Sequence, residues 1–144
     1  MKALCLSTLF FMLITQAFSA DRSSLEYFRL SIEEIQMGLS FEENISQNRG
    51  VKGTFTLTRS EVRKIINHTK KSLEYSKLVK DDDLDWMDPS LFFKSLSKNY
   101  ENLFREGLRL KIEAWNEGDL AIGLKANRLL NEWGSYYRKM RKKL

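Results

Sequence analysis

The sequence is poor in cysteine, histidine, proline and glycine, and each scarcity excludes something. Of its 144 residues, one is cysteine, one is histidine, one is proline and seven are glycine. A single cysteine excludes a disulfide framework within the chain. The longest alternation of apolar and polar residues is the short stretch 53–58, so strands are not expected. The scarcity of helix breakers therefore predicts an all-α protein.

The first 20 residues have the pattern of a secretory signal peptide. Lys2 supplies the positive start, residues 3–14 are mostly apolar, and Ala17-Phe18-Ser19 offers small residues before a cleavage position. The apolar run is too short for a membrane span and is followed by polar residues. We therefore predict a signal peptide over residues 1–20, cleaved at its end. The mature chain, residues 21–144, is expected to be a single domain without a membrane span, periplasmic or secreted.

Cysteine and charge narrow the compartment and the partners. The only cysteine, Cys5, lies in the leader, so the exported chain has no thiol. An exported domain without disulfides is more typical of a bacterial periplasm than of a eukaryotic secreted protein. The chain has 24 Lys and Arg against 19 Asp and Glu, a formal net charge of +5. Because the two signs are interspersed, no nucleic-acid partner is expected.

Four helical segments are expected after the leader. Their ranges are about 23–48, 59–79, 89–116 and 119–143. Thr58 and Glu61 form a capping box before the second helix, and Asp88-Pro89 is a favourable start for the third. Gly118 suits the end of the third helix, and Asp119 opens the fourth. Four helices joined by short loops predict a single up-down-up-down antiparallel four-helix bundle.

Apolar residues at three-and-four spacing give each of the last two helices a predicted inward seam. The seam of the third helix is Phe93, Leu96, Tyr100, Leu103, Gly107, Leu110 and Ala114. The seam of the fourth is Gly123, Ala126, Leu130, Trp133, Tyr137, Met140 and Leu144. Phe104, Leu108 and Trp115 flank the third seam, so they are expected either to widen the core or to form the contact of a homodimer.

Two runs of like charge are expected to lie at the same end of the bundle. Residues 81–88 form an acidic loop, and residues 138–143 form a basic tail. In an up-down topology the second connection and the end of the fourth helix share one pole. We therefore predict that the two runs face each other, as a structural contact of small energy.

The Asn116-Glu117-Gly118 turn, its spacing to the chain end, and the closing run 137–141 resemble the small periplasmic haem-b cytochromes built as four-helix bundles. The resemblance implies a haem held by a methionine of the first helix and a histidine near the end of the fourth. Here Arg138 occupies the histidine position, and arginine offers no lone pair to iron. Met37 is the only methionine of the first helix. The resemblance therefore implies a cytochrome-like bundle without haem.

The alternative is a haem-b electron-transfer protein with altered axial ligation. Its ligands would come from Met37, Tyr137 and Arg138, of which tyrosine has a precedent as a haem ligand. The chain has no Cys-x-x-Cys-His motif, so haem would not be attached covalently.

No set of residues points to catalysis, so we predict a non-enzymatic protein. No phosphate-binding loop or serine–histidine–acid set can be assembled, and His68 is expected to be a helix-surface residue without metal partners. The predicted function is binding of a partner protein or a small apolar ligand; an envelope chaperone is disfavoured by the closed seams. The aromatic side chains near the pole of the acidic loop are expected to fill the core themselves. The alternative is an apolar ligand pocket, whose candidate residues are Leu25, Phe28, Trp86, Trp133, Tyr137 and Met140.

Overall fold

The computed structural model describes residues 4–49, 57–86 and 96–141, with side chains described over 24–48, 57–84 and 96–140. These ranges contain helices and turns and no strand, so the all-α prediction is confirmed. The helices are α1 (Leu4–Arg49), α2 (Arg59–Lys77), α3 (Asp81–Trp86), α4 (Leu96–Asn99), a π-helical segment (Tyr100–Arg105), α5 (Glu106–Glu117) and α6 (Leu120–Arg141). The predicted ranges 59–79 and 119–143 agree with α2 and α6 to within two residues.

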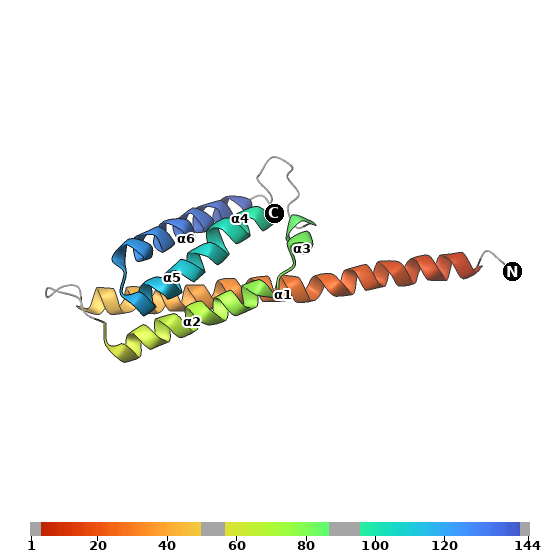
Figure 1. The fold of residues 1–144 in the computed structure, drawn as a ribbon. Coiled ribbons are helices and arrows are strands. Elements are labelled where there is room, and N and C mark those ends of the chain that lie inside the picture. Colours follow the sequence, from red (N-terminus) through yellow and green to blue (C-terminus); the bar gives the residue numbers. More distant parts are fainter. Residues whose placement is uncertain (1–3, 50–56, 87–95, 142–144) are drawn as a thin grey trace.

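The helices form two hairpins that lie against each other. Helix α1 packs on α2, α5 packs on α6, and the two pairs meet mainly through α2 and α5. Helix α4, the π-helical segment and α5 follow one another without interruption. Figure 1 shows that α2 returns along α1, and that α6 returns along α5, with the turn between α5 and α6 at the end of the molecule opposite α3.

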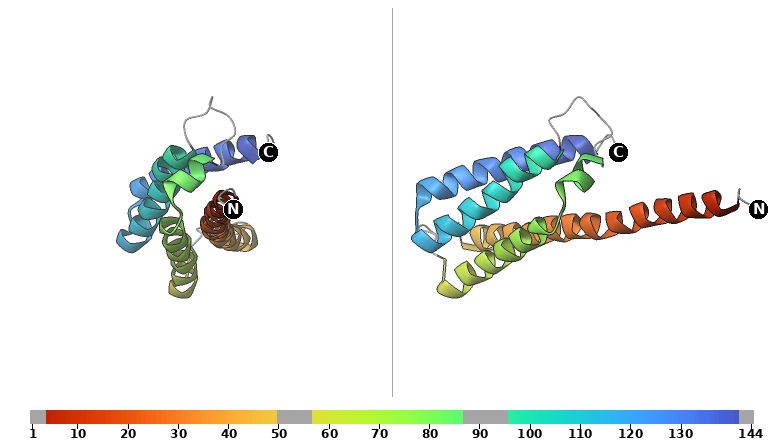
Figure 2. Two further views of the ribbon diagram at one scale, coloured as in Figure 1. Left: turned by 90° about the vertical axis from the view of Figure 1, so that its right-hand side faces the viewer. Right: turned by 45° about the vertical axis from the view of Figure 1, so that its right-hand side comes forward.

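Helix α1 begins much earlier than the predicted residue 23. It starts at Leu4 because no proline or glycine interrupts the sequence before Gly38. Its first part, the red end in Figures 1 and 2, extends away from the other helices. Tertiary packing is in place by Ser24, which is buried and whose hydroxyl donates to Asp83 of α3.

The predicted helix ends are confirmed where they are described. The backbone N–H of Glu61 donates to the Thr58 hydroxyl at 3.3 Å, and the Glu61 carboxylate accepts from the Thr58 N–H at 2.8 Å, which completes the capping box. Gly118 ends α5 in the left-handed conformation, with φ of 70°. The Asp119 carboxylate accepts from the N–H groups of Ala121 and Ile122 at 2.8 and 3.1 Å. The predicted start at Asp88-Pro89 lies outside the described residues.

The predicted seam of the third helix is confirmed at Leu96, Tyr100 and Gly107, which are buried, but it misses other inward positions. The predicted seam residue Phe93 lies outside the described residues. The π-helical segment inserts an extra residue into the turn, which shifts the inward face by one position. Phe104 and Leu108 therefore lie in the core, with 1% and 0% of their surface exposed, whereas Leu103, Leu110 and Ala114 are only partly buried. Because Phe104 and Leu108 are buried within the chain, they widen its core, which is one of the two alternatives, and are not available for a dimer contact. The predicted fourth seam holds, since Ala126, Leu130 and Trp133 are buried.

Among the described side chains, the acidic run has partners other than the basic tail. The side chains of Asp85, Asp88 and residues 141–143 lie outside the described part of the chain. Residues 81–86 form helix α3 rather than a loop, and Asp81 lies 3.3 Å from the guanidinium of Arg105, while Asp83 accepts from Ser24. Helix α3 and the end of α6 do lie at the same end of the molecule (Figure 1). Within the described side chains, however, no ion pair joins them; Asp81 and Asp83 instead contact the π-helical segment and α1.

Arg105 connects three elements at this end of the molecule. Its guanidinium donates to the carbonyl of Ser76 at 3.1 and 2.6 Å and to that of Val79 at 2.8 Å. Ser76 lies in the last turn of α2, where its carbonyl also accepts from the N–H of Val79 at 3.3 Å, and Val79 follows the end of the helix. Since the Arg105 side chain is largely buried, it ties the C-terminal end of α2 to the π-helical segment.

Two ionisable groups beside Arg105 have shifted pKa values. Burial raises the pKa of the Tyr100 hydroxyl, whose oxygen lies 2.7 Å from that of Ser31. Burial also tends to raise the pKa of Glu101, but hydrogen bonds from Arg105 and Arg109 outweigh it, so the pKa of Glu101 is lowered. The junction is therefore built for a neutral phenol and an ionised carboxylate.

Candidate functional site

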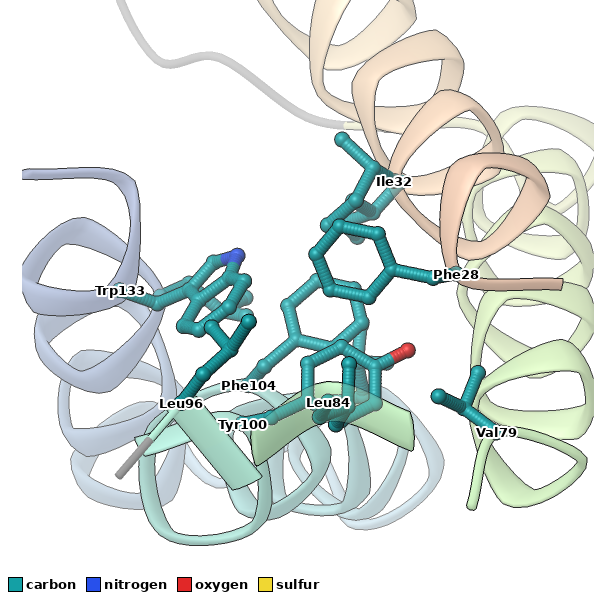
Figure 3. Close-up of a cluster of buried hydrophobic side chains, with 11 residues drawn as sticks. Phe28, Ile32, Val79, Leu84, Leu96, Tyr100, Phe104 and Trp133 are labelled. Carbon is teal, nitrogen blue, oxygen red and sulfur yellow. The ribbon is translucent and has the colours of Figure 1, made fainter. Parts of the chain in front are cut away.

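The aromatic residues that are the candidates for a ligand pocket form the core instead. The rings of Phe28, Tyr100, Phe104 and Trp133 pack against one another (Figure 3). The centroids of the ring pairs in contact are 5.0 to 6.3 Å apart. Tyr137 stacks on Trp133 at 5.7 Å. The side chains in contact occupy the space that a ligand would need.

The remaining described residues of the candidate pocket do not alter the conclusion that the aromatic side chains form the core. Met140 packs against the same cluster, whereas Leu25 is exposed on the surface of α1. The side chain of Trp86 lies outside the described residues. Among the described side chains, this cluster is therefore filled by its own residues.

The predicted haem ligands are not brought together. Tyr137 packs against Phe28 at 5.8 Å between ring centroids. Met37 follows Phe28 in α1 by nine residues, which corresponds to about 13.5 Å along the axis and about half a turn around it. Met37 is therefore exposed on the opposite face of α1. Arg138 is exposed and donates to Ser135 at 3.4 Å.

His68 has a partner that the sequence did not reveal. Its Nδ1 lies 2.8 Å from a carboxylate oxygen of Glu34, and the side chain is half-buried between α1 and α2. The close approach depends on Gly38, since a Cβ at that position would lie 3.1 Å from the Cβ of His68. Glu34 and His68 lie on different helices, so helical spacing could not link them. In the part of the chain with described side chains, no group of three or more His, Cys, Asp and Glu residues could hold a metal ion.

A cavity of about 290 Å³ lies at the opposite end of the molecule from the aromatic core, beside the turn between α5 and α6. It opens between the C-terminal part of α1 and the α5–α6 hairpin. Trp115, Leu120 and Leu124 supply its apolar wall, and Ala114 and Gly123 leave room between them. Leu120 and Leu124 are 77% and 63% exposed, so apolar surface continues from the cavity onto α6. Trp115, expected in a wide core or in a homodimer contact, thus lines this cavity.

An ion pair forms the polar side of the cavity. The Nζ of Lys111 lies 2.9 Å from a carboxylate oxygen of Glu42 and 3.4 Å from the Oδ1 of Asn127. The side chain of Lys111 is 5% exposed and that of Glu42 is 28% exposed. A lysine this deeply buried requires a counter-charge, because an isolated ammonium is costly to remove from water. Lys111 and Glu42 are therefore a mutually dependent pair.

Glu42 and Lys111 each lie on the buried face of their helix, seven residues after a core residue. Glu42 follows Phe28 and Ile35 at intervals of seven residues, on the buried stripe of α1. Lys111 follows Phe104 by the same interval. The pair was not predicted, because the predicted seam has Leu110, and not Lys111, on the inward face. The signal in the sequence was the carboxylate of Glu42, which stands at the end of the apolar stripe of α1 where an apolar residue would be expected.

Two other depressions are wider but more open. One, of about 690 Å³, lies along the outer side of α6, and one of about 620 Å³ lies over α1 and α2 next to Met37 and His68. A ligand in either would keep much of its surface in water, so neither offers the enclosure of the smaller cavity. We therefore take the cavity with the Lys111–Glu42 pair as the candidate site.

Comparison of the chain with protein-family models, with curated proteins and with solved structures finds no match. In the described part of the chain, no helix has the length and apolar character needed to cross a membrane. The candidate site therefore has to be interpreted from its own chemistry, which is an apolar wall facing a compensated pair of charges.

Proposed function

We propose that this chain is an exported, non-enzymatic helical-bundle protein that binds a small apolar ligand in the cavity between α1 and the α5–α6 hairpin. The observation that carries the proposal is the buried Lys111–Glu42 pair beside the apolar wall of Trp115, Leu120 and Leu124. Binding sites for small molecules commonly combine a mainly apolar lining with a few fixed polar groups.

The energetics of the pair support a role beyond stability. A buried ion pair is often no more stabilising than apolar residues of similar volume. Glu42 and Lys111 take heptad positions where leucine would extend the core formed by Ile35 and Phe104. Two charges kept at such positions, next to exposed leucines, are better explained by recognition than by packing.

The export part of the proposal rests on the leader pattern and on its place in the fold. The leader part of α1 extends beyond the other helices (Figure 1). Ser24 is already buried, and its hydroxyl donates to Asp83 of α3. Cleavage after residue 20 would thus leave the packing of the described side chains unchanged. We assign the mature chain to the periplasm, since it lacks cysteine.

For the architecture, we propose an up-down-up-down antiparallel four-helix bundle related to the haem-b cytochromes but without their cofactor. The alternating course of α1, α2, α5 and α6 supports this arrangement (Figure 2). A haem-b electron carrier is the less favoured function, because Met37 and Tyr137 lie on opposite sides of α1.

The test compares two glycine variants of α6. Gly123 lines the cavity, and a Cβ there would make only ordinary contact with Ala114 at 3.6 Å; a Cβ at Gly134 would meet nothing within 4 Å. Gly123→Met should fill the cavity, whereas Gly134→Met is the matched control. Both changes remove a helix-interior glycine, so both proteins should stay folded.

The probe is N-phenyl-1-naphthylamine, a neutral molecule whose fluorescence rises in apolar surroundings. We expect saturable binding by the wild type and the Gly134→Met variant, and at least about tenfold weaker binding by Gly123→Met, the equivalent of losing about 1.4 kcal/mol of binding free energy. Equal binding by all three proteins, or none by the wild type, contradicts the proposal. In a parallel titration with haemin, a saturable Soret shift lost in Met37→Leu and in Tyr137→Phe would favour the electron carrier instead.

A further inference from the structure

We infer that the ligand is an uncharged amphiphile: a compact apolar body that carries one neutral polar head group, such as a hydroxyl or a primary amide. The inference rests on the proposed function, because it names the chemical class that the same cavity selects. It follows from the charge balance of the Lys111–Glu42 pair and from the size of the cavity.

The pair offers one donor and one acceptor for a head group. An ammonium has three N–H donors, and Lys111 directs two of them to Glu42 Oε2 and Asn127 Oδ1. Its third N–H has no acceptor among the described side chains. The second carboxylate oxygen of Glu42 likewise accepts from none of them. A hydroxyl or amide can accept from Lys111 and donate to Glu42 at the same time.

A charged head group would not gain from this pair. The two charges are 2.9 Å apart, so any group that contacts one lies within a few ångströms of the other. A ligand carboxylate would be attracted by Lys111 and repelled by Glu42, and a ligand ammonium would experience the reverse. The attraction and repulsion nearly cancel, whereas the cost of removing the charged head from water remains.

The remaining charge at the cavity does not alter this preference. Asp119 also lines it, but its carboxylate is exposed and is bound to the first N–H groups of α6. Its negative charge is thus offset by the positive end of the helix dipole and screened by water.

The size of the cavity limits the apolar body. Its volume of about 290 Å³ is at the lower end of the range of about 300–1,000 Å³ that holds drug-sized ligands. Trp115 offers a flat face and Leu120 and Leu124 offer flexible aliphatic contact. A single ring with a short chain suits these walls better than a haem or a long-chain lipid.

The test uses three probes with the same body and different heads: 4-phenylbutan-1-ol, 4-phenylbutanoate and 4-phenylbutylammonium. Isothermal titration calorimetry at neutral pH measures the affinity of each for the wild-type protein. We expect the alcohol to bind at least about tenfold more tightly than either ion. In Glu42→Gln, which leaves Lys111 as the only charge of the pair, the carboxylate should become the tightest ligand.

The outcomes separate this inference from the proposed function. If no probe binds and N-phenyl-1-naphthylamine also fails, the proposed function is wrong. If the probes bind but an ion binds most tightly to the wild type, the cavity binds ligands and the inference of a neutral head is wrong. A double variant, Lys111→Met with Glu42→Leu, covers the case in which Glu42→Gln does not fold. The wild type should bind the alcohol more tightly than butylbenzene, which is the same body without a head group. The double variant should lose this preference, and an unchanged preference would contradict the inference.

Discussion

Removing either partner of the Lys111–Glu42 pair should destabilise the protein, by an amount that depends on which partner is removed. In Glu42→Leu, the ammonium of Lys111 stays buried with 5% of its side chain exposed and without its counter-charge. In Lys111→Met, the carboxylate of Glu42 is left with 28% of its side chain exposed to water. The first variant should therefore be the less stable, because the charge that remains is the more deeply buried one.

The magnitudes follow from burial. Breaking a fully buried ion pair costs about 3–5 kcal/mol, and partial solvation of Glu42 reduces the expected cost of Glu42→Leu to about 2–4 kcal/mol. Lys111→Met should cost about 1–2 kcal/mol, since its partner keeps contact with water. The double variant replaces both charges by apolar side chains and should lie within about 1 kcal/mol of the wild type. The two changes should therefore be strongly non-additive.

Chemical denaturation followed by circular dichroism measures the free energy of unfolding of all four proteins. The exposed pair Arg29–Glu33, with its partners 2.7 Å apart on one face of α1, is the matched control. Glu33→Leu should change the free energy of unfolding by less than about 1 kcal/mol. A double variant as unstable as the sum of its single changes would refute the coupling, and a harmless Glu42→Leu would refute the burial of Lys111.

Three further predictions concern the rest of the fold. Gly107→Ala should destabilise the protein by about 1–3 kcal/mol in a denaturation experiment, because the new Cβ would lie 2.8 Å from the Cγ of Leu130; Gly134→Ala, in open space, should not. Arg105→Met should cost about 2–3 kcal/mol by removing the hydrogen bonds to the carbonyls of Ser76 and Val79, and a loss below about 0.5 kcal/mol would contradict its role in holding this end of α2. The folded-state pKa of Glu101 is lowered, so its contribution to the free energy of unfolding is present above the unfolded-state pKa and is lost as the pH falls through the folded-state pKa. The free energy of unfolding of Glu101→Gln should therefore fall less steeply with acid than that of the wild type. An identical slope would count against the shift.

Local chemistry was sufficient to predict most helix ends. The capping box at Thr58 and Glu61, the left-handed Gly118 and the cap at Asp119 each depend on residues within one turn of one another. Such signals can be read from a sequence without knowledge of the tertiary structure. The all-α composition and the inward face of α6 follow from spacing alone.

The inward face of α5 could not be predicted, because it depends on packing between distant segments. Tyr100 and Phe104 stack on each other at 5.0 Å and meet Phe28 and Trp133 from other helices. The π-helical turn that allows this packing has no marker in the local sequence. The same one-residue shift turns Lys111 inward. The candidate site could therefore not be predicted from a seam that has Leu110 on the inward face.

The most direct test of ligand binding at this site is a two-dimensional ¹⁵N nuclear magnetic resonance titration of the protein with 4-phenylbutan-1-ol, observed at the tryptophan indole N–H groups. Trp115 lines the cavity, and Trp133 lies in the filled aromatic core, so the two signals report on the two competing locations. We predict a saturable shift of the Trp115 signal, no shift of the Trp133 signal, and loss of the response in Gly123→Met. A shift of Trp133 alone, or no shift of either signal, would contradict the assignment of the binding site to this cavity.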